Sequence, residues 1–466
     1  MLTSNGLRKI EDIDAADVYS AYDDTAKKES ASFNRATLID NGIREVVKVD
    51  IRGSEPIVCT PDHRFLVARN NDYEWKEARE LQPQDKLAMP QNDTLNMYKD
   101  ARPVDMDFAT AGWMIGDGWQ CSYDKGETRG VCFGPADVYA QEVVIPILNR
   151  YLTELGCPRS VKTHVAENGV VSWASSSNRF AAHLEERFGI VASLSKRKVI
   201  PDKVMYGSSP AEQASFLGGL FSADGMVGNY SGDRYVALSS ASEQLLYDVQ
   251  ALLRCFGIHG RVVYGDTPGR PGRGQGHLKI HGAGNLSKFK THIGFVLSPA
   301  KTDKLSAMGL PGPAPKREWH SVNKVDAAGQ ARVYDLNVPT THTFVANGAA
   351  THNCNLGSLC LPAFVVDGKF DYEGLMAATR VLARNLDRSV TAGGESRLSR
   401  RLMNVLRRTQ GDRLDILPRG GGPAFQPAPP PHRHRRPGSA GKRLYEGFTR
   451  PVQLLSWLPI AFSSRR

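Results

Sequence analysis

Apolar and polar residues follow two different periods along this chain, and the change of period divides it. Strict alternation over short stretches predicts β-strands. The stretches with this pattern are residues 44–51, 56–60, 65–67, 331–338 and 343–346. Because they lie near both ends of the first 353 residues, the pattern predicts one all-β domain in two parts, residues 1–104 and 314–353.

Residues 105–313, between these parts, show a helical period instead. Apolar side chains recur three and four residues apart in two segments, which favours amphipathic helices. They are Val143, Val144, Ile147, Leu148, Tyr151, Leu152 and Leu155, and then Leu245, Leu246, Val249, Leu252, Leu253 and Phe256. The expected architecture is an α/β domain inserted into, and splitting, the β domain.

The inserted region repeats internally. Residues 110–118 (TAGWMIGDG) align with residues 217–225 (LGGLFSADG), and an amphipathic helix follows each. Each motif has small residues four apart, Gly112 with Gly116 and Gly219 with Ala223, which allow two helix backbones to approach closely. We therefore expect a pseudo-twofold domain in which the two motif helices pack together.

This packing would bring Asp117 and Asp224 together at the carboxyl ends of the two helices. There the carboxylates repel each other and face the negative end of each helix dipole, so a divalent, oxygen-seeking cation is the natural complement. Such ions support phosphodiester hydrolysis. The alternative is that Gly-Asp-Gly simply ends a helix, but two aligned copies make this less plausible than a single copy would.

The paired motifs resemble those of the LAGLIDADG (dodecapeptide) homing endonucleases. The resemblance implies Mg²⁺ held by Asp117 and Asp224, a basic residue between the motifs at Lys198, and double-stranded DNA as the partner. Both half-sites lie in one chain, so it also implies a monomer. A DNA-binding dodecapeptide relative that does not cut is the alternative, and the presence of both aspartates argues against it.

A second constellation lies at the ends of the β regions. An Asn side-chain amide can attack its own backbone carbonyl and cleave the chain when geometry and a proton donor assist. A thiol that follows the Asn can receive an acyl group. Both residues occur in His352-Asn353-Cys354, and His342 lies nearby in sequence.

These segments resemble the conserved blocks of inteins, which splice themselves out of a host protein. By that resemblance Thr60 and His63 contact the upstream scissile peptide, and Asp335 coordinates the steps. His342 and His352 assist the cyclisation of Asn353, and Cys354 is the nucleophile. The β domain would then have the horseshoe-like Hint fold.

The character of the sequence changes twice after Asn353. Residues 354–394 resemble the large subunit of ribonucleoside-diphosphate reductase, so the intein's DNA target would be the intein-less reductase gene. An active reductase, the other alternative, fails because most of that enzyme has no counterpart here. Residues 395–466 are rich in Arg, Pro and Gly, with 15 Lys and Arg against 4 Asp and Glu. We expect this basic tail to be disordered, dispensable and read out of frame.

The overall expectation is an α+β multidomain chain that combines a split Hint domain, an inserted endonuclease and a disordered tail. Residue 2 falls within the first intein block, so we expect the initiating nucleophile to be missing and splicing to be lost.

The 7 cysteines form no CxxC pair, and no apolar run is long enough to span a bilayer. A cytoplasmic protein without a membrane partner is expected.

Overall fold

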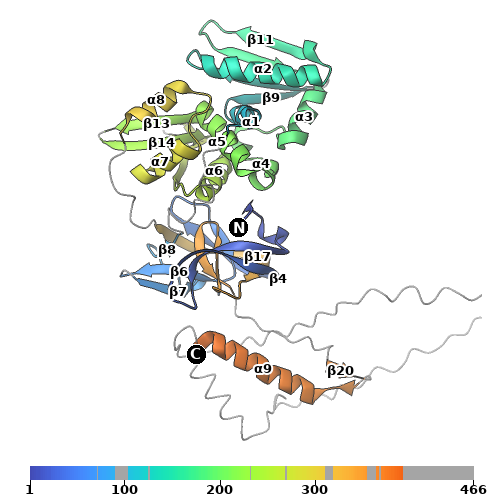
Figure 1. Ribbon diagram of the computed structural model, residues 1–466, viewed down its shortest axis with the longest axis vertical. Helices are drawn as coiled ribbons and strands as arrows, with labels where there is room; N and C mark the ends of the chain where they lie inside the picture. Colours follow the sequence, from blue (N-terminus) through green and yellow to red (C-terminus); the bar gives the residue numbers. More distant parts are fainter. Residues whose placement is uncertain are drawn as a thin grey trace, which may run out of the picture. The chain divides into compact units, whose positions relative to one another are not determined.

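The computed structural model describes residues 1–70, 72–89, 103–123, 126–230, 232–267, 270–309, 319–353, 364–366 and 369–391. The chain forms two compact units, Met1–Cys354 and Asn355–Arg466. In the first unit, strands from both ends of the sequence join one 11-stranded sheet with the order β18-β19-β6-β8-β17-β4-β3-β1-β2, in which β5 pairs with β4 and β7 pairs with β6. Figure 1 shows these blue and orange strands interleaved in one body.

The elements of this β region come from both sides of the insertion. The amino-terminal part has β1 (Leu2–Thr3), β2 (Gly6–Leu7), η1 (Ile10–Asp12), β3 (Ala15–Asp23), β4 (Lys28–Ile51), β5 (Ile57–Cys59), β6 (Arg64–Arg69), β7 (Asp72–Glu77), η2 (Ala78–Glu80) and β8 (Lys86–Ala88). The carboxyl-terminal part has β17 (Trp319–Asn337), β18 (Thr343–Ala346) and β19 (Ala349–His352). The antiparallel pair β4 and β17 joins the two parts.

The inserted region contains two four-stranded sheets of the same topology. Each begins with a motif helix and continues with two strands, a helix, two strands and a helix, and in each sheet the fourth strand lies between the second and the third. The first copy has α1 (Met106–Gly116), β9 (Gly118–Tyr123), β10 (Gly126–Phe133), α2 (Val138–Glu154), η3 (Pro158–Ser160), β11 (Val161–Val165), β12 (Val171–Ser175) and α3 (Asn178–Phe188). The connection contains η4 (Ser195–Arg197) and α4 (Asp202–Gly207). The second copy has α5 (Pro210–Asp224), β13 (Gly225–Tyr230), β14 (Asp233–Ser240), α6 (Glu243–Cys255), β15 (Arg261–Thr267), β16 (Arg270–His281), α7 (Ala283–His292) and α8 (Pro299–Ala307). The shared topology confirms the predicted internal repeat.

The motif helices α1 and α5 pack directly against each other, as predicted (Figure 1). A Cβ atom built on Gly112 would lie 1.9 Å from the Phe216 carbonyl oxygen, and one on Gly219 would lie 1.9 Å from that of Ala109. Only glycine fits where two helix backbones come this close. Both helices also begin with strong caps: Asp105 accepts from the backbone of α1, and Ser209 forms a capping box with Glu212 in α5.

We expect Gly112→Ala to lower the stability of the first unit by about 3 kcal/mol, because the added methyl group overpacks a backbone contact. In calorimetry this corresponds to a midpoint lower by roughly 5–10 °C. Gly207→Ala is the matched control, since a Cβ there meets nothing within 4 Å. It should be neutral or slightly stabilising. Equal midpoints for the two variants would contradict the packing described.

Polar contacts also connect the inserted region to the β region. Arg254 of α6 donates to the backbone oxygen of Asn347 (3.0 Å) and to the hydroxyl of Ser54 (2.7 Å). Gln250 of the same helix donates to the carbonyl of Gly53 at 2.7 Å. Asn347 lies in the turn between β18 and β19, so α6 supports the hairpin that leads to Asn353.

The second unit is described only in part: β20 (Val365–Val366) pairs with β21 (Lys369–Phe370), and α9 (Tyr372–Thr391) follows. The basic tail, expected to be disordered, lies outside the described residues. Within the described part of the chain, no helix combines the length and the apolar character that crossing a bilayer requires.

Candidate functional site

Two groups of polar side chains stand out in the first unit, and the first lies where α1 and α5 end. Asp117 caps α1, with its amide bonded to the Trp113 carbonyl at 3.0 Å, and Asp224 is the last residue of α5. A Cβ atom built on Gly116 would lie 3.2 Å from Oδ2 of Asp224, so that carboxylate faces the end of α1. The packing of the two helices therefore brings both aspartates together.

The glycines and the aspartates of the motifs have different explanations. Cβ atoms on Gly118 and Gly225 would lie 1.9 and 2.3 Å from carbonyl oxygens of the preceding helix, so packing alone requires these glycines. The aspartate side chains have no such role: within the described residues, neither Asp117 nor Asp224 has a hydrogen-bonded partner for its carboxylate. A helix-ending turn accounts for the glycines and leaves the two carboxylates unexplained.

Two lysines complete this group symmetrically. Lys198 donates from Nζ to the carbonyls of Gly116 (2.6 Å) and Gly118 (3.3 Å) at the end of α1. Lys301 donates to those of Ser222 (2.6 Å) and Ala223 (3.0 Å) at the end of α5. Sequence reasoning singled out Lys198 and missed Lys301. Aligning residues 294–298 (GFVLS) with residues 189–193 (GIVAS) places Lys301 opposite Lys196 and not opposite Lys198, so the repeat did not indicate Lys301 as the counterpart of Lys198.

Burial and mutual repulsion shape the electrostatics of this group. Burial, then Asp224 and Asp137, raise the pKa of Asp117 to about 6, and burial also raises the pKa of Asp224. Burial lowers the pKa of Lys198 and Lys301, which the nearby carboxylates oppose. Two adjacent carboxylates without hydrogen-bond donors are a suitable oxygen donor set for Mg²⁺, which commonly takes one or two protein carboxylates and completes its shell with water and phosphate.

The second group surrounds Asn353 at the end of β19. The backbone amide of Asn353 donates to the His342 carbonyl at 2.9 Å. In the orientation that satisfies its neighbours, the side-chain amide donates to the same carbonyl at 2.7 Å and accepts from the Val338 amide at 3.2 Å. His342 has a φ of +57°, a conformation that costs about 1–3 kcal/mol. The side-chain amide that would attack is thus held in place.

His352 faces the carbonyl that an attack would use. Its Nδ1 lies 2.5 Å from the Asn353 carbonyl oxygen and 2.9 Å from Nη2 of Arg64. Its Nε2 lies 3.2 Å from Oδ2 of Asp24, and Trp75 packs edge-on against the ring. Asp24 and Arg64 were not recognised from the sequence. They are 328 and 288 residues away from His352, and no local pattern indicated them.

The other predicted residues lie around this group. Thr60 follows β5, and its carbonyl accepts from the His63 amide at 3.1 Å. The His63 ring packs against Phe65 and Phe344, and burial lowers its pKa, which Asp335 opposes. Asp335 is buried in β17, and the His342 ring stacks on that of His352. The side chains of His63, Asp335, His342 and His352 therefore lie near one another, and Thr60 joins them through its backbone contact with His63. Cys354 lies outside the described residues.

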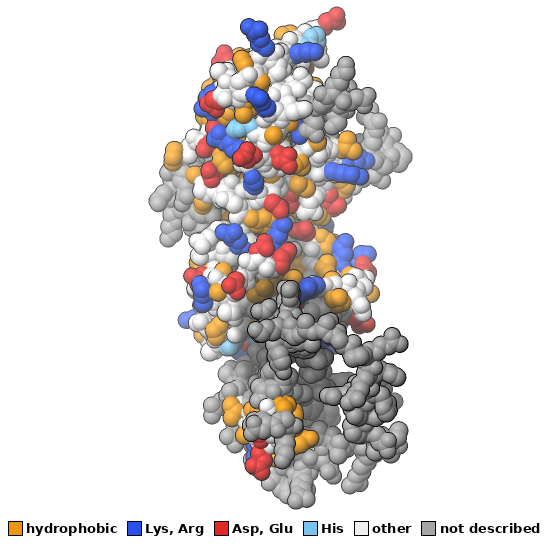
Figure 2. Space-filling view, turned by 90° about the vertical axis from the view of Figure 1, so that its right-hand side faces the viewer, with side chains coloured by type: hydrophobic (Ala, Val, Ile, Leu, Met, Phe, Trp, Pro, Cys, Tyr) orange, Lys and Arg blue, Asp and Glu red, His pale blue; other side chains and the backbone are white. Residues whose placement is uncertain are grey.

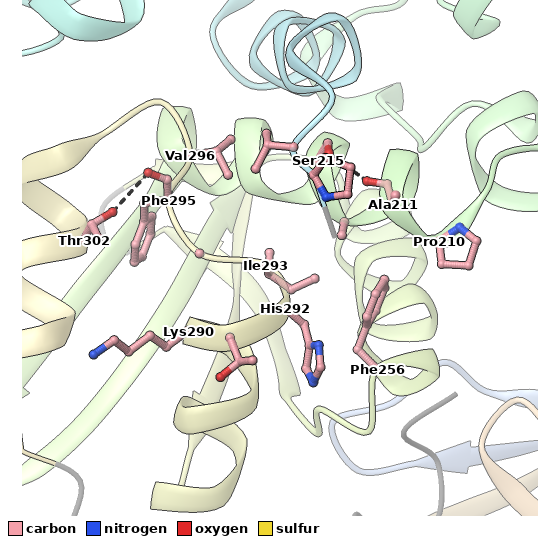
Figure 3. A pocket seen from close by; sticks show the side chains of 15 residues that line it. Pro210, Ala211, Ser215, Phe256, Lys290, His292, Ile293, Phe295, Val296 and Thr302 are labelled. Atoms are coloured by element: carbon pink, nitrogen blue, oxygen red, sulfur yellow. Dashed lines mark hydrogen bonds between the residues drawn. The ribbon is translucent and has the colours of Figure 1, made fainter. Parts of the chain in front are cut away.

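A pocket of about 280 Å³ lies beside the start of α5 (Figure 3). Phe256, Ile293 and Phe295 supply apolar lining, and Lys290 and His292 are the charged or titratable side chains in it. Asp224 lies at the opposite end of α5, about 20 Å along the helix axis. The pocket is therefore separate from the carboxylate pair.

Comparison with known proteins places the sequence in context. Mycobacterium tuberculosis protein RecA is 28% identical over 268 residues, which are 54% of this chain and 32% of that protein. Replicative DNA helicase DnaB of Rhodothermus marinus is 28% identical over 293 residues, 60% of this chain and 29% of the helicase. A DNA polymerase of Thermococcus hydrothermalis is 34% identical over 149 residues, 30% of this chain and 9% of the polymerase. The chain thus spans a third or less of the length of these relatives.

Among solved structures, the homing endonuclease I-DmoI in complex with DNA and Ca is 17% identical, covering 43% of this chain and 97% of that chain with a TM-score of 0.31. The LAGLIDADG homing endonuclease I-SmaMI bound to cleaved DNA is 10% identical, covering 45% and 97% with a TM-score of 0.25. TM-scores of this size do not establish a shared fold.

Two protein families match the chain directly. The family described as Ribonucleotide reductase, barrel domain, matches residues 309–409, in agreement with the reductase resemblance of residues 354–394. The family described as Intein splicing domain matches residues 1–353, about three quarters of the sequence. The chain therefore belongs to the intein splicing domain family.

Proposed function

We propose that this intein cleaves the peptide bond after Asn353 and, with Mg²⁺, cuts double-stranded DNA at the carboxylate pair. The contact between Nδ1 of His352 and the Asn353 carbonyl oxygen, at 2.5 Å, carries the first activity. The convergence of Asp117 and Asp224 at the ends of two packed helices carries the second. The two groups lie in different parts of the first unit, so each activity is tested separately.

Peptide cleavage follows from the way Asn353 is held. The His342 carbonyl accepts a hydrogen bond from the side-chain amide, which polarises that N–H bond, holds Nδ2 in place and makes it a better nucleophile toward the Asn353 carbonyl carbon. Protonated His352 donates from Nδ1 to the carbonyl oxygen while negative charge develops there. The bond between the Asn353 carbonyl and residue 354 then breaks, and a succinimide forms at Asn353. By family resemblance, Thr60, His63, Asp335 and Cys354 serve the steps of splicing that precede this cleavage.

DNA cleavage would use the carboxylate pair. Asp117 and Asp224 would hold Mg²⁺, which activates water and stabilises the leaving oxygen in phosphodiester hydrolysis. Lys198 and Lys301 neutralise the carbonyl ends of α1 and α5 and place positive charge beside the carboxylates. Within the described residues, no group of three or more His, Cys, Asp or Glu forms a metal site. Water and DNA phosphates would complete the ion's shell.

The surface is consistent with local rather than global attraction of DNA. Figure 2 shows acidic and basic side chains interspersed over the face in view. The two four-stranded sheets carry exposed Lys162 on β11 and Arg261 on β15. Each such side chain that contacts phosphate would add to binding and to its salt dependence. A monomer with two similar halves would contact both halves of one DNA site.

The proposed domain boundaries rest on the change of sequence pattern, and the pairing of β4 with β17 supports a β domain in two parts. A split Hint domain comprises residues 1–104 and 314–353, and a LAGLIDADG endonuclease comprises residues 105–313. Residues 354–394 are a fragment of the reductase host. RecA, DnaB and a DNA polymerase each match through a minor part of their length, which supports an element inserted into different hosts. The uninterrupted reductase gene would be the DNA target.

Two measurements test the proposal on the full chain. Plasmid DNA carrying the reductase sequence that encodes the junction before residue 354 should be linearised with Mg²⁺ and left intact with a chelator. Linearisation in the presence of chelator would overturn the metal-dependent mechanism. Mass spectrometry after prolonged incubation should reveal a fragment that ends at Asn353 or its succinimide, and a chain that stays intact would overturn the peptide cleavage.

A further inference from the structure

Asp24, which follows β3, occupies an unusual position for an acidic residue beside a turn. Its side chain is only 12% exposed. Oδ1 accepts from Nε1 of Trp75 at 2.6 Å and from Nζ of Lys27 at 2.8 Å, and Oδ2 lies 3.2 Å from Nε2 of His352. A buried carboxylate is costly unless it is hydrogen-bonded, and these three contacts provide that compensation. One of the three donors is the imidazole that faces the scissile carbonyl.

The contacts of His352 define where its protons lie. A carboxylate only accepts, so Nε2 must carry a hydrogen to bond Asp24. Nδ1 has two neighbours of opposite kind, because the Arg64 guanidinium only donates and the Asn353 carbonyl only accepts. Nδ1 therefore accepts from Arg64 when the ring is neutral and donates to the carbonyl when the ring is an imidazolium. The hydrogen on Nε2 is common to both states.

We propose that Asp24 is a positioning residue for Asn353 cyclisation, which fixes the Nε2–H tautomer of His352 and stabilises its imidazolium form. The proposal rests on the peptide cleavage proposed above. In that step Nδ2 of Asn353 bonds to its own carbonyl carbon and loses one proton, while the bond to residue 354 breaks and the leaving nitrogen gains one. The imidazolium carries the hydrogen that meets the carbonyl oxygen while charge develops, and Asp24 acts only through the ring.

The charged groups near the ring make this role specific to Asp24. The positive charges of Arg64 on β6 and Lys27 after β3 disfavour the imidazolium form of His352. The imidazoles of His63 and His342 also lie near this ring. Asp23 is the neighbouring acid, but its Oδ1 accepts from the amides of Thr25 and Ala26. Burial alone would raise the pKa of Asp24, but hydrogen bonds from His352, Lys27 and Trp75 lower it well below its usual range, so the group is a carboxylate at neutral pH.

A first test does not depend on cleavage. In a chain with Asn353→Ala, ¹⁵N-histidine NMR should show neutral His352 as the Nε2–H tautomer, with the signal assigned by its loss in His352→Gln. Adding Asp24→Asn should lower the pKa of this ring by at least about one unit, because the adjacent negative charge is lost. Asp23→Asn, a matched change one residue away, should leave the titration unchanged. An unchanged His352 titration in Asp24→Asn overturns the proposal.

A second test measures the rate of fragment release between pH 5 and 9. Asp24→Asn should slow release about 100-fold at pH 7.5, within the range of general acid catalysis. In the pH–rate profile, the fall in rate that accompanies deprotonation of the His352 imidazolium should move to lower pH in Asp24→Asn. The difference in rate between this variant and the native chain should therefore shrink toward pH 5. An equal deficit at every pH would indicate a merely structural role and overturn the proposal. If the chain with native Asn353 stays intact while the NMR shift is seen, the proposed cleavage fails and the role of Asp24 in His352 protonation stands.

Discussion

Asp117→Asn and Asp224→Asn are each expected to lower the rate of DNA cleavage on the order of 10³-fold, comparable to the loss of one strong transition-state interaction. Asparagine keeps the size of the side chain but removes half of the negative charge that would hold Mg²⁺. Both aspartates would be needed to hold Mg²⁺, so neither is expected to substitute for the other.

Stability distinguishes this prediction from general damage. Neither carboxylate is hydrogen-bonded within the described residues, and burial raises the pKa of both. Neutralising one of them should therefore leave the thermal midpoint unchanged or higher, because repulsion between two buried charges is relieved. Asp202→Asn, which changes an exposed aspartate paired with Lys9, is the control and should cut normally. Plasmid linearisation and calorimetry on the same preparations decide the matter, and cutting that persists in either motif variant would disprove the site.

Elements whose apolar residues recur at one regular spacing could be predicted from the sequence. Elements in which that spacing is interrupted could be predicted only in part. Residues 143–155 and 245–256 lie almost wholly in α2 and α6, because one face of each helix is continuously apolar. The strands β4 and β17 are 24 and 19 residues long, but the sequence indicated only parts of them. The pairing between them shifts register at three places, and each shift resets which side chains face the core. A pattern search with a fixed period of two stops at such points.

The candidate sites also contain residues that a local motif predicts and residues that only the folded structure brings together. Asp117 and Asp224 were predicted because a local motif occurs twice. Lys301 was missed because aligning the repeats does not place it opposite Lys198. Asp24 and Arg64 were missed because only the folded sheet brings β3, β6 and β19 together. No local sequence pattern around residue 24 or residue 64 indicates a contact with residue 352. Residues that act through a long-range contact require the structure.

Replacing Asn353 with alanine is expected to abolish release of the carboxyl-terminal fragment, because cyclisation has no nucleophile without the side-chain amide. The native chain should yield a fragment ending at Asn353 or its succinimide, together with a peptide that begins at Cys354. Asn337→Ala is a suitable control, since Asn337 is exposed at the end of β17, and this variant should cleave like the native chain.

The size of the effect follows from the geometry around the amide. His342 holds both the backbone and the side-chain nitrogen of Asn353 through one carbonyl, at 2.9 and 2.7 Å, and a misplacement of about 1 Å can cost about 100-fold in rate. Asn353→Gln would move the amide one methylene further away and require a six-membered ring, so it should be slower than the native chain by at least that factor. Intact mass spectrometry over several days measures all four chains. Equal release from the native and Asn353→Ala chains would mean that hydrolysis or a contaminating protease, and not Asn353, cuts the bond.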